Sequence, residues 1–149
     1  MMKVATLRKM IFAAVLAVSA QAGAAEHTVK MLNQGEDGTM VFEPGFLKVA
    51  PGDTVTFVAE DPAHNTNAVL TPEGGTDWKG DINEEVTVTL NQEGVFVYKC
   101  DPHTSLGMVG VIQVGEATNL KKAKDKAASL KGKMATNKGR IDQYLDQVE

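Results

Sequence analysis

Short runs rich in β-branched and apolar residues recur along most of the chain, and they constrain its fold more than any other feature. Two clear examples, 54–58 and 86–90, are bounded by Gly, Pro, Asn and Asp residues that favour turns. Similar runs occupy 29–32, 40–42, 46–49, 95–98 and 108–114. About seven or eight short strands with this spacing predict an antiparallel β-sandwich or barrel.

The pattern changes after this region. From Leu120 onward Ala, Lys and Leu replace the β-branched runs, which favours helix. The sequence Asn-Lys-Gly at 137–139 predicts a break that gives two helices. The residues expected to pack on the sandwich at helical spacing are Leu120, Ala123, Ala127 and Leu130. The lysines expected on the solvated face, with a docking or membrane-surface role as the alternative, are Lys121, Lys122, Lys124, Lys126, Lys131 and Lys133.

The amino terminus has the three-part pattern of a secretory signal peptide. Lys3, Arg8 and Lys9 precede an apolar run at 10–18, and small residues follow. The nine residues of this run are too few for a membrane anchor, which needs roughly 20. Cleavage after Ala22, Ala24 or Ala25 fits the pattern equally well. We therefore expect a leader at 1–25, a main domain at 26–116, a helical extension at 117–149, and a periplasmic protein without a membrane span in its mature form.

Charge is distributed unevenly along the chain. The whole chain has a formal net charge of -4, with 15 Lys and Arg residues against 19 Asp and Glu residues. Residues 26–116 contain 15 acids and only four bases, whereas 117–149 contain four acids and eight bases. An acidic main domain excludes a basic nucleic-acid binder.

The residues with metal-binding chemistry gather in two predicted loops. Cys100, His103 and Met108 lie between two predicted strands, and His64 lies in a loop after an earlier strand. Two imidazoles, a thiolate and a thioether are the ligand set of a blue-copper electron-transfer site. The soft thiolate bonds strongly to copper, and the thioether favours Cu(I). The pattern therefore predicts one copper ion that cycles between Cu(II) and Cu(I).

Each of these residues has a simpler interpretation when it is taken alone. A lone cysteine is often a buried small hydrophobe, although an unpaired thiol in an exported protein needs a reason. The histidines alone would suit surface loops, and Met108 alone would suit the core. A thiol hydrolase would use Cys100 with a histidine base, but the sequence shows no oxyanion motif and leaves Met108 without a role. A zinc or copper-trafficking protein is the other alternative, and zinc rarely takes a thioether. We therefore expect an electron carrier and not an enzyme.

Several motifs together resemble a known family. The loop Cys-x-x-His-x-x-x-x-Met at 100–108, the pair His64-Asn65, and the segments at 40–44 and 51–55 are similar to those of the pseudoazurins, small type 1 copper proteins among the cupredoxins. The resemblance covers about 29–120 and extends to the helical tail. It implies an eight-stranded Greek-key β-sandwich with two terminal helices, in a monomer that exchanges electrons transiently with nitrite reductases or c-type cytochromes. The copper ligands that it implies are His64, Cys100, His103 and Met108.

Two neighbours of the ligands have expected supporting roles. Asn65 is placed to hydrogen-bond across to the Cys100 loop and hold the two loops together, with a simple turn role as the alternative. Pro102 has no backbone N–H and so donates no hydrogen bond to the Cys100 sulfur. Because such a bond weakens thiolate donation to Cu(II), its absence is expected to lower the reduction potential.

The electron-transfer surface is expected around His103. In cupredoxins the imidazole of this loop typically reaches the surface through an apolar patch, for which Pro102, Leu106 and Ala63 are the candidates. The family usually surrounds this patch with lysines. Here the nearby bases are Lys99 and Lys79, and the nearby acids are Glu60, Asp61 and Asp101. This departure predicts a weak dependence of electron transfer on salt, or a preference for basic partners.

Overall fold

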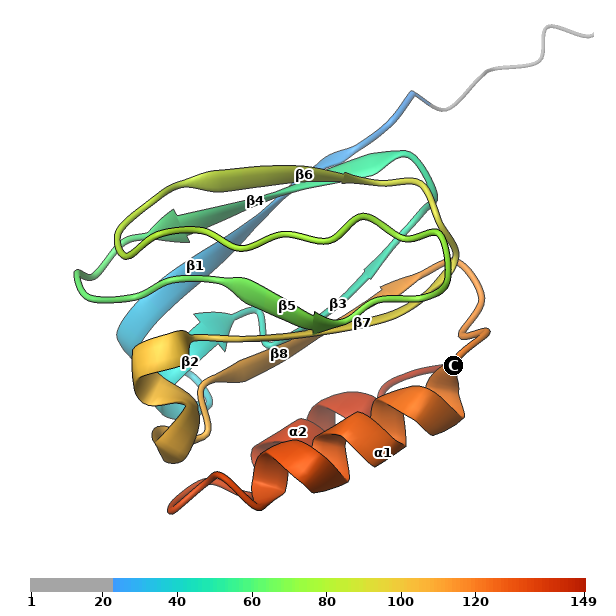
Figure 1. Cartoon of the computed structure of the whole chain (residues 1–149). Coiled ribbons are helices and arrows are strands. Elements are labelled where there is room, and N and C mark those ends of the chain that lie inside the picture. Colours follow the sequence, from blue (N-terminus) through green and yellow to red (C-terminus); the bar gives the residue numbers. More distant parts are fainter. Residues whose placement is uncertain (1–22) are drawn as a thin grey trace, which may run out of the picture.

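Eight strands form two facing sheets in the computed structural model, which describes residues 23–149 (Figure 1). The strands are β1 Glu26–Gly35, β2 Gly38–Glu43, β3 Phe46–Val49, β4 Asp53–Ala59, β5 Asn67–Leu70, β6 Val86–Leu90, β7 Gly94–Lys99 and β8 Val109–Val114. All seven runs identified in the sequence form strands, so the mainly β prediction is confirmed. The expected leader, 1–25, lies outside the described residues except for its last three positions.

The sheets are mixed, with the strand orders β2-β1-β4-β6 and β3-β8-β7-β5. The expectation of purely antiparallel pairing was wrong for two pairs, because β1 pairs with β4 and β3 pairs with β8 in parallel. The cause is the path of the chain, which crosses from one sheet to the other after β2 and returns after β3. The strands β1 and β4, like β3 and β8, are therefore not joined by a hairpin, and they can pair in parallel. The eighth strand, β5, was missed because its four residues include only one β-branched side chain.

The main core lies between the two sheets. In β4 the residues at alternate positions, Asp53, Val55 and Phe57, are buried, as expected for a strand with one face against the core. Aromatic rings fill the space between the sheets: Phe57 stacks on Trp78 at 5.4 Å, and Phe42 meets Tyr98 edge-on at 4.7 Å between ring centroids. This packing gives the rigid frame that carries the loops at each end.

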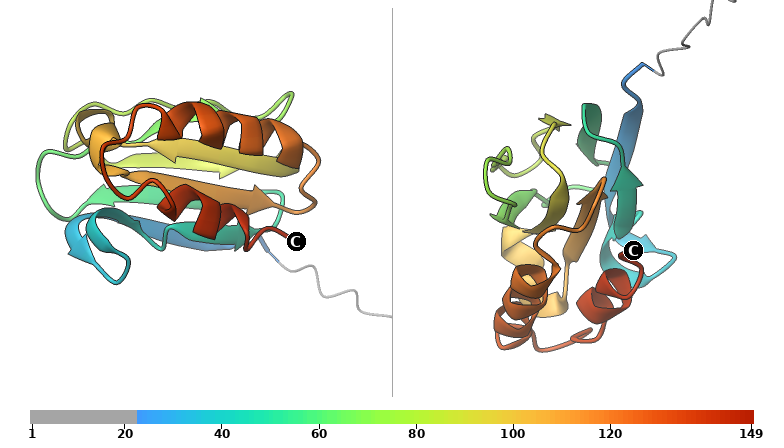
Figure 2. Two further views of the ribbon diagram at one scale, coloured as in Figure 1. Left: turned by 90° about the horizontal axis from the view of Figure 1, so that it is seen from below. Right: turned by 90° about the vertical axis from the view of Figure 1, so that its right-hand side faces the viewer.

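A second core lies between one sheet and two helices, α1 Leu120–Lys131 and α2 Arg140–Leu145. Both helices cover the outer face of the sheet that contains β7 and β8 (Figure 2). The strand β8 is therefore buried along its whole length. The helical pattern of the tail is confirmed: Ala123, Ala127 and Leu130 are buried against this sheet, and the lysines of α1 are exposed or half-exposed.

Among the described residues, no helix has the length and the apolar character that crossing a membrane requires.

Candidate metal centre

The two candidate ligand loops meet at one end of the sandwich. His64 lies between β4 and β5, and Cys100 directly follows β7. A short 3₁₀ helix, Asp101–Leu106, then carries His103. Pro102 suits the first turn of this helix because its missing N–H would have no partner there. Gly107 ends it in a left-handed conformation, with φ of 76°, and the chain continues through Met108 into β8.

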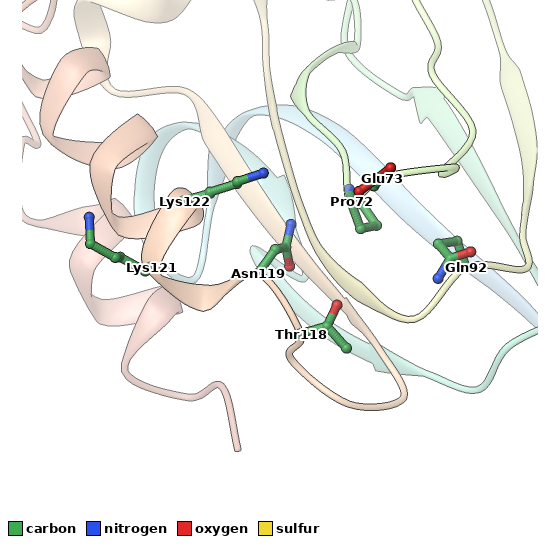
Figure 3. Close-up of a pocket in the computed structure, with 7 residues that line it drawn as sticks. All are labelled: Pro72, Glu73, Gln92, Thr118, Asn119, Lys121 and Lys122. Carbon is green, nitrogen blue, oxygen red and sulfur yellow. The ribbon is translucent and has the colours of Figure 1, made fainter.

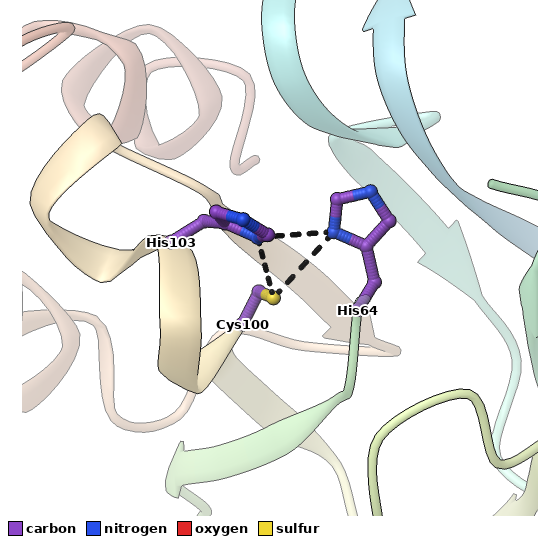
Figure 4. Close-up of side chains that lie close together, drawn as sticks. All are labelled: His64, Cys100 and His103. Carbon is purple, nitrogen blue, oxygen red and sulfur yellow. Dashed lines mark hydrogen bonds between the residues drawn. The ribbon is translucent and has the colours of Figure 1, made fainter. Parts of the chain in front are cut away.

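Three potential ligand atoms converge between the loops (Figure 4). The Nδ1 atoms of His64 and His103 are 3.1 Å apart, and the Cys100 Sγ lies 3.7 Å and 3.4 Å from them, respectively. The point equidistant from these three atoms lies about 2.0 Å from each, which suits metal–nitrogen and metal–sulfur bonds of about 2.0–2.3 Å. The residues thus fit a single metal ion. His64 and Cys100 are fully buried, and His103 is half-buried.

The orientation of His64 is set by a residue that the sequence analysis missed. The Nε2 of His64 lies 2.9 Å from the side-chain oxygen of Asn33, which only accepts hydrogen bonds. The proton of the neutral ring is therefore on Nε2, and Nδ1 is left free to bind a metal. No local signal identifies Asn33, because the contact joins residues 31 positions apart in the sequence.

Burial shifts the pKa values of both buried candidate ligands, His64 and Cys100. It lowers the pKa of His64, and repulsion from His103 adds to this effect, while Asp61 opposes it. Burial also raises the pKa of the Cys100 thiol. Both shifts favour the uncharged side chains, so a cation that binds here must displace the thiol proton.

Asn65 connects the two ligand loops. Its side-chain oxygen accepts a bond from the Asp101 backbone N at 2.7 Å, and its amide nitrogen donates to the Asp101 carboxylate at 2.9 Å. The expected cross-loop hydrogen bond is therefore present. Burial disfavours ionisation of Asp101, but bonds from Lys99, Asn67 and Asn65 outweigh this and hold its pKa well below the usual range.

Backbone hydrogen bonds tie Met108 to the same loop. The Cys100 N donates to the Met108 carbonyl at 3.0 Å, and the Met108 N donates to the His103 carbonyl at 3.2 Å. The side chain of Met108 is fully buried in the same core as Cys100.

The three apolar residues predicted for the electron-transfer surface are exposed. Leu106 is 36% exposed, and Pro102 and Ala63 are also exposed. Ala63 has a positive φ of 73°, which is uncommon for a residue with a side chain, and its N–H donates to the Asn83 side chain at 2.7 Å. This turn brings Ala63 to the surface directly before the buried His64.

One hollow at the surface lies away from these candidate ligands. It has a volume of about 600 Å³ and is lined by polar residues near the start of α1 (Figure 3). The lining residues are Pro72, Glu73, Gln92, Thr118, Asn119, Lys121 and Lys122. None of the candidate copper ligands lines it, so this hollow is separate from the candidate metal centre.

Comparison with known proteins identifies the family of this chain. Residues 29–115 match the family of copper binding proteins, plastocyanin/azurin family. Pseudoazurin from Paracoccus pantotrophus is 45% identical over 139 residues, which cover 91% of this chain and 92% of that protein. The chain belongs to the pseudoazurin family. The protein is accordingly a blue copper electron carrier of the cupredoxin type and not an enzyme. Its cofactor is a type 1 copper ion.

Solved structures of this family share the fold. Native pseudoazurin from Hyphomicrobium denitrificans is 40% identical with a TM-score of 0.73, covering 83% of this chain and 98% of that one. Pseudoazurin from Methylobacterium extorquens AM1 is 33% identical with a TM-score of 0.70, covering 83% and 99%. The predicted cupredoxin sandwich with its helical extension is therefore confirmed.

Proposed function

We propose that His64, Cys100, His103 and Met108 hold the copper ion, and that the protein shuttles single electrons between redox proteins of the periplasm. The observation that carries this proposal is the convergence of two Nδ1 atoms and one Sγ within 3.7 Å. Met108, whose backbone is hydrogen-bonded to Cys100 and His103, would supply the thioether that favours Cu(I).

The copper ion supplies a one-electron couple, and the protein keeps its ligands in place while the charge changes. Asn33 orients His64, and Asn65 joins the two loops. The turn at 81–84 supports His64 further, because the Asn83 N–H donates to the His64 carbonyl at 2.8 Å. Ligands held by such bonds need little rearrangement on electron transfer, which keeps transfer fast.

His103 is the proposed route for the electron. Of the three converging side chains it alone is exposed to solvent, because His64 and Cys100 are fully buried. Pro102, Leu106 and Ala63 form an apolar contact surface beside it. Transient redox encounters bury less than about 1,200 Å², so a small patch suffices for a monomer that meets its partners briefly.

The charges near this surface argue against strong attraction to an acidic partner. The Lys99 ammonium lies 2.8 Å from the Asp101 carboxylate, and the Lys30 ammonium lies 2.9 Å from that of Glu60. These lysines are thus paired with acids of the same chain. The partner that we consider is a nitrite reductase or a c-type cytochrome. We expect the rate of electron exchange with it to depend only weakly on salt. A fall of this rate with salt is expected only when the partner is basic. A steep fall with salt against an acidic partner, measured by stopped-flow, would contradict this.

The copper site is tested by loading the protein with Cu(II). The oxidised protein should be intensely blue, with a thiolate-to-copper band at about 600 nm and a narrow copper hyperfine splitting in its EPR spectrum. A protein that stays colourless after copper loading would refute the proposed ligand set. Zinc binding tighter than copper binding would favour the alternative of a zinc protein.

Export with removal of the leader is also part of the proposal. The Ala25 N lies 2.9 Å from the Asp53 carboxylate, and the Ala25 carbonyl accepts a bond from the Thr54 N at 3.0 Å. Cleavage after Ala24 would turn the first of these bonds into an ion pair with the new amino terminus. We therefore favour Ala24 among the possible cleavage sites. The intact mass of the protein recovered from the periplasm distinguishes this site from cleavage after Ala22 or Ala25.

A further inference from the structure

Three consecutive carbonyl groups between His103 and Met108 accept hydrogen bonds from the C-terminal extension. The donors belong to the connection between the two helices, 132–139, and to the first residue of α2. The bonds run from Ala135 N to Ser105 O at 2.7 Å, from Asn137 Nδ2 to Leu106 O at 3.0 Å, and from Arg140 Nη1 to Gly107 O at 3.0 Å. The extension therefore contacts the loop that joins two proposed copper ligands.

Arg140 is the central residue of this contact. Its side chain is only 5% exposed, and no ion pair involves it in the described part of the chain. Four backbone carbonyls solvate its charge instead. Nη1 donates to Met40 O at 2.9 Å and Gly107 O at 3.0 Å, and Nη2 donates to Asp37 O at 3.2 Å and Thr39 O at 3.0 Å. One planar group thus joins the β1–β2 hairpin, the ligand loop and α2.

Attachment of a helix does not require such a residue. The helix α1 packs on the same sheet through the apolar side chains of Ala123, Ala127 and Leu130. A buried charge is costly unless its donors are all used, so Arg140 is poorly explained by packing alone. A planar guanidinium, with five donors in a fixed arrangement, suits bonds to carbonyls in two separate segments at once.

The ligand loop has little room to move against this connection. A Cβ added at Gly107 would lie 2.8 Å from the Asn137 Cβ and 3.0 Å from the carbonyl oxygens of Thr136 and Asn137. Gly107 directly precedes Met108, so any displacement of its peptide would shift the thioether. The close approach and the hydrogen bonds act on the same three residues, 105–107.

We propose that Arg140 and the 132–139 connection are a positioning element for the copper site, which fixes the 105–107 segment and thereby the distance of Met108 from the metal. This inference rests on the proposed ligand set. The axial ligand tunes the reduction potential of a blue-copper site, and residues that orient ligands commonly affect metal affinity. The helical extension therefore acts on the properties of the copper and not only on stability.

Three variants test this inference. Arg140→Lys keeps the charge but loses the fork that spans two segments. Asn137→Gly removes the bond to Leu106, and glycine tolerates the positive φ of 55° at this position. Tyr144→Phe is the matched control, because it removes a bond from the same helix to the same turn, Tyr144 OH to Asp37 at 2.9 Å, without touching the ligand loop.

We expect Arg140→Lys to weaken copper binding by about tenfold or more, measured by competition with a chelator. The EPR rhombicity and the ratio of the two thiolate-to-copper bands should change with it, since both report the axial ligand. Asn137→Gly should change the same quantities less, because it removes one bond. Tyr144→Phe should lower stability and leave the spectra and the affinity unchanged. In the copper-free proteins, amide hydrogen exchange at Gly107 and Met108 should accelerate in the first two variants only.

The outcomes separate the possible explanations. Wild-type spectra and copper affinity in both Arg140→Lys and Asn137→Gly would overturn the proposal and leave the extension a packing element. Equal changes in Tyr144→Phe would overturn it as well, because the effect would then follow stability alone. If Arg140→Lys does not fold, Asn137→Gly decides the matter by the same criteria. A wild-type protein that never becomes blue would instead refute the ligand set on which the inference rests.

Discussion

The two ends of β4 each carry a buried polar cluster, and the clusters differ in how their donors and acceptors match. At the start of the strand the Asp53 carboxylate accepts bonds from Ala25 N at 2.9 Å and Ala50 N at 3.0 Å, and the His27 Nε2 lies 2.8 Å away. Every contact there joins a donor to an acceptor. This cluster is complete without any further group.

Beyond the other end of β4, three atoms that can each bind a metal face each other. His64 Nδ1, His103 Nδ1 and Cys100 Sγ are each within 3.7 Å of the other two, and each has a lone pair to offer. A cation that displaces the thiol proton could bind all three atoms at once. The comparison teaches that the Asp53 cluster holds chain segments together through matched donors and acceptors, whereas the other cluster gathers three atoms that can each bind a metal.

The largest expected effect follows from removing the sulfur of Cys100. Cys100→Ser should abolish the intense blue band completely, because that band requires a copper–thiolate bond. The fold should persist, since serine is of similar size. Absorption spectra of the copper-loaded variant test this, with Asp53→Asn as the control that keeps the full band. A blue Cys100→Ser protein would contradict our assignment of the thiolate.

The second prediction separates the two histidines by their exposure. His103→Gly and His64→Gly should both lose the blue site, but added imidazole should restore it only in His103→Gly. The reason is access: His64 is fully buried, whereas His103 reaches the surface. Titration with imidazole, followed by absorption, measures the difference. Equal recovery in both variants would argue against His103 as the exposed route for electrons.

The third prediction concerns the cluster around Asp53, at the start of β4. Bonds from His27, and then from Ala25 and Ala50, hold the pKa of Asp53 below its usual value. The ionised carboxylate therefore stabilises the fold above its unfolded pKa of about 3.9, and this contribution is lost as the pH falls through the lower folded value. Asp53→Asn should be less stable than the wild type at neutral pH, and the difference should shrink in acid. Urea unfolding of the copper-free proteins at several pH values tests this; a difference that stays constant with pH would count against it.

The smallest expected effect is a change in potential without loss of the site. Pro102→Ala introduces a backbone N–H near the Cys100 sulfur. A hydrogen bond to the thiolate weakens its donation to Cu(II), so the reduction potential should rise while the protein stays blue. Voltammetry of the two proteins measures the shift, and an unchanged or lower potential would exclude this role for Pro102.

Much of the fold was predictable because its signals are local. The strand β6 was located from its β-branched residues and flanking turns, and α1 from the spacing of Ala123, Ala127 and Leu130. The parallel pairs β1–β4 and β3–β8 were not predictable from such signals, because pairing depends on how the chain crosses between sheets. The strand β5 was not predicted, because its four residues form a strand through pairing with β7 and carry no strong strand signal of their own.

The sequence by itself determined the chemistry of the metal centre, because a thiol, two imidazoles and a thioether in this spacing suit copper better than other metals. Only the tertiary structure decided what surrounds the ligands. Asn33 meets His64 across 31 positions, and Arg140 reaches Gly107 across 33 and Thr39 across 101. The physical reason is that ligand identity is a property of single side chains, whereas orientation and restraint come from hydrogen bonds between segments that only the folded sandwich brings together.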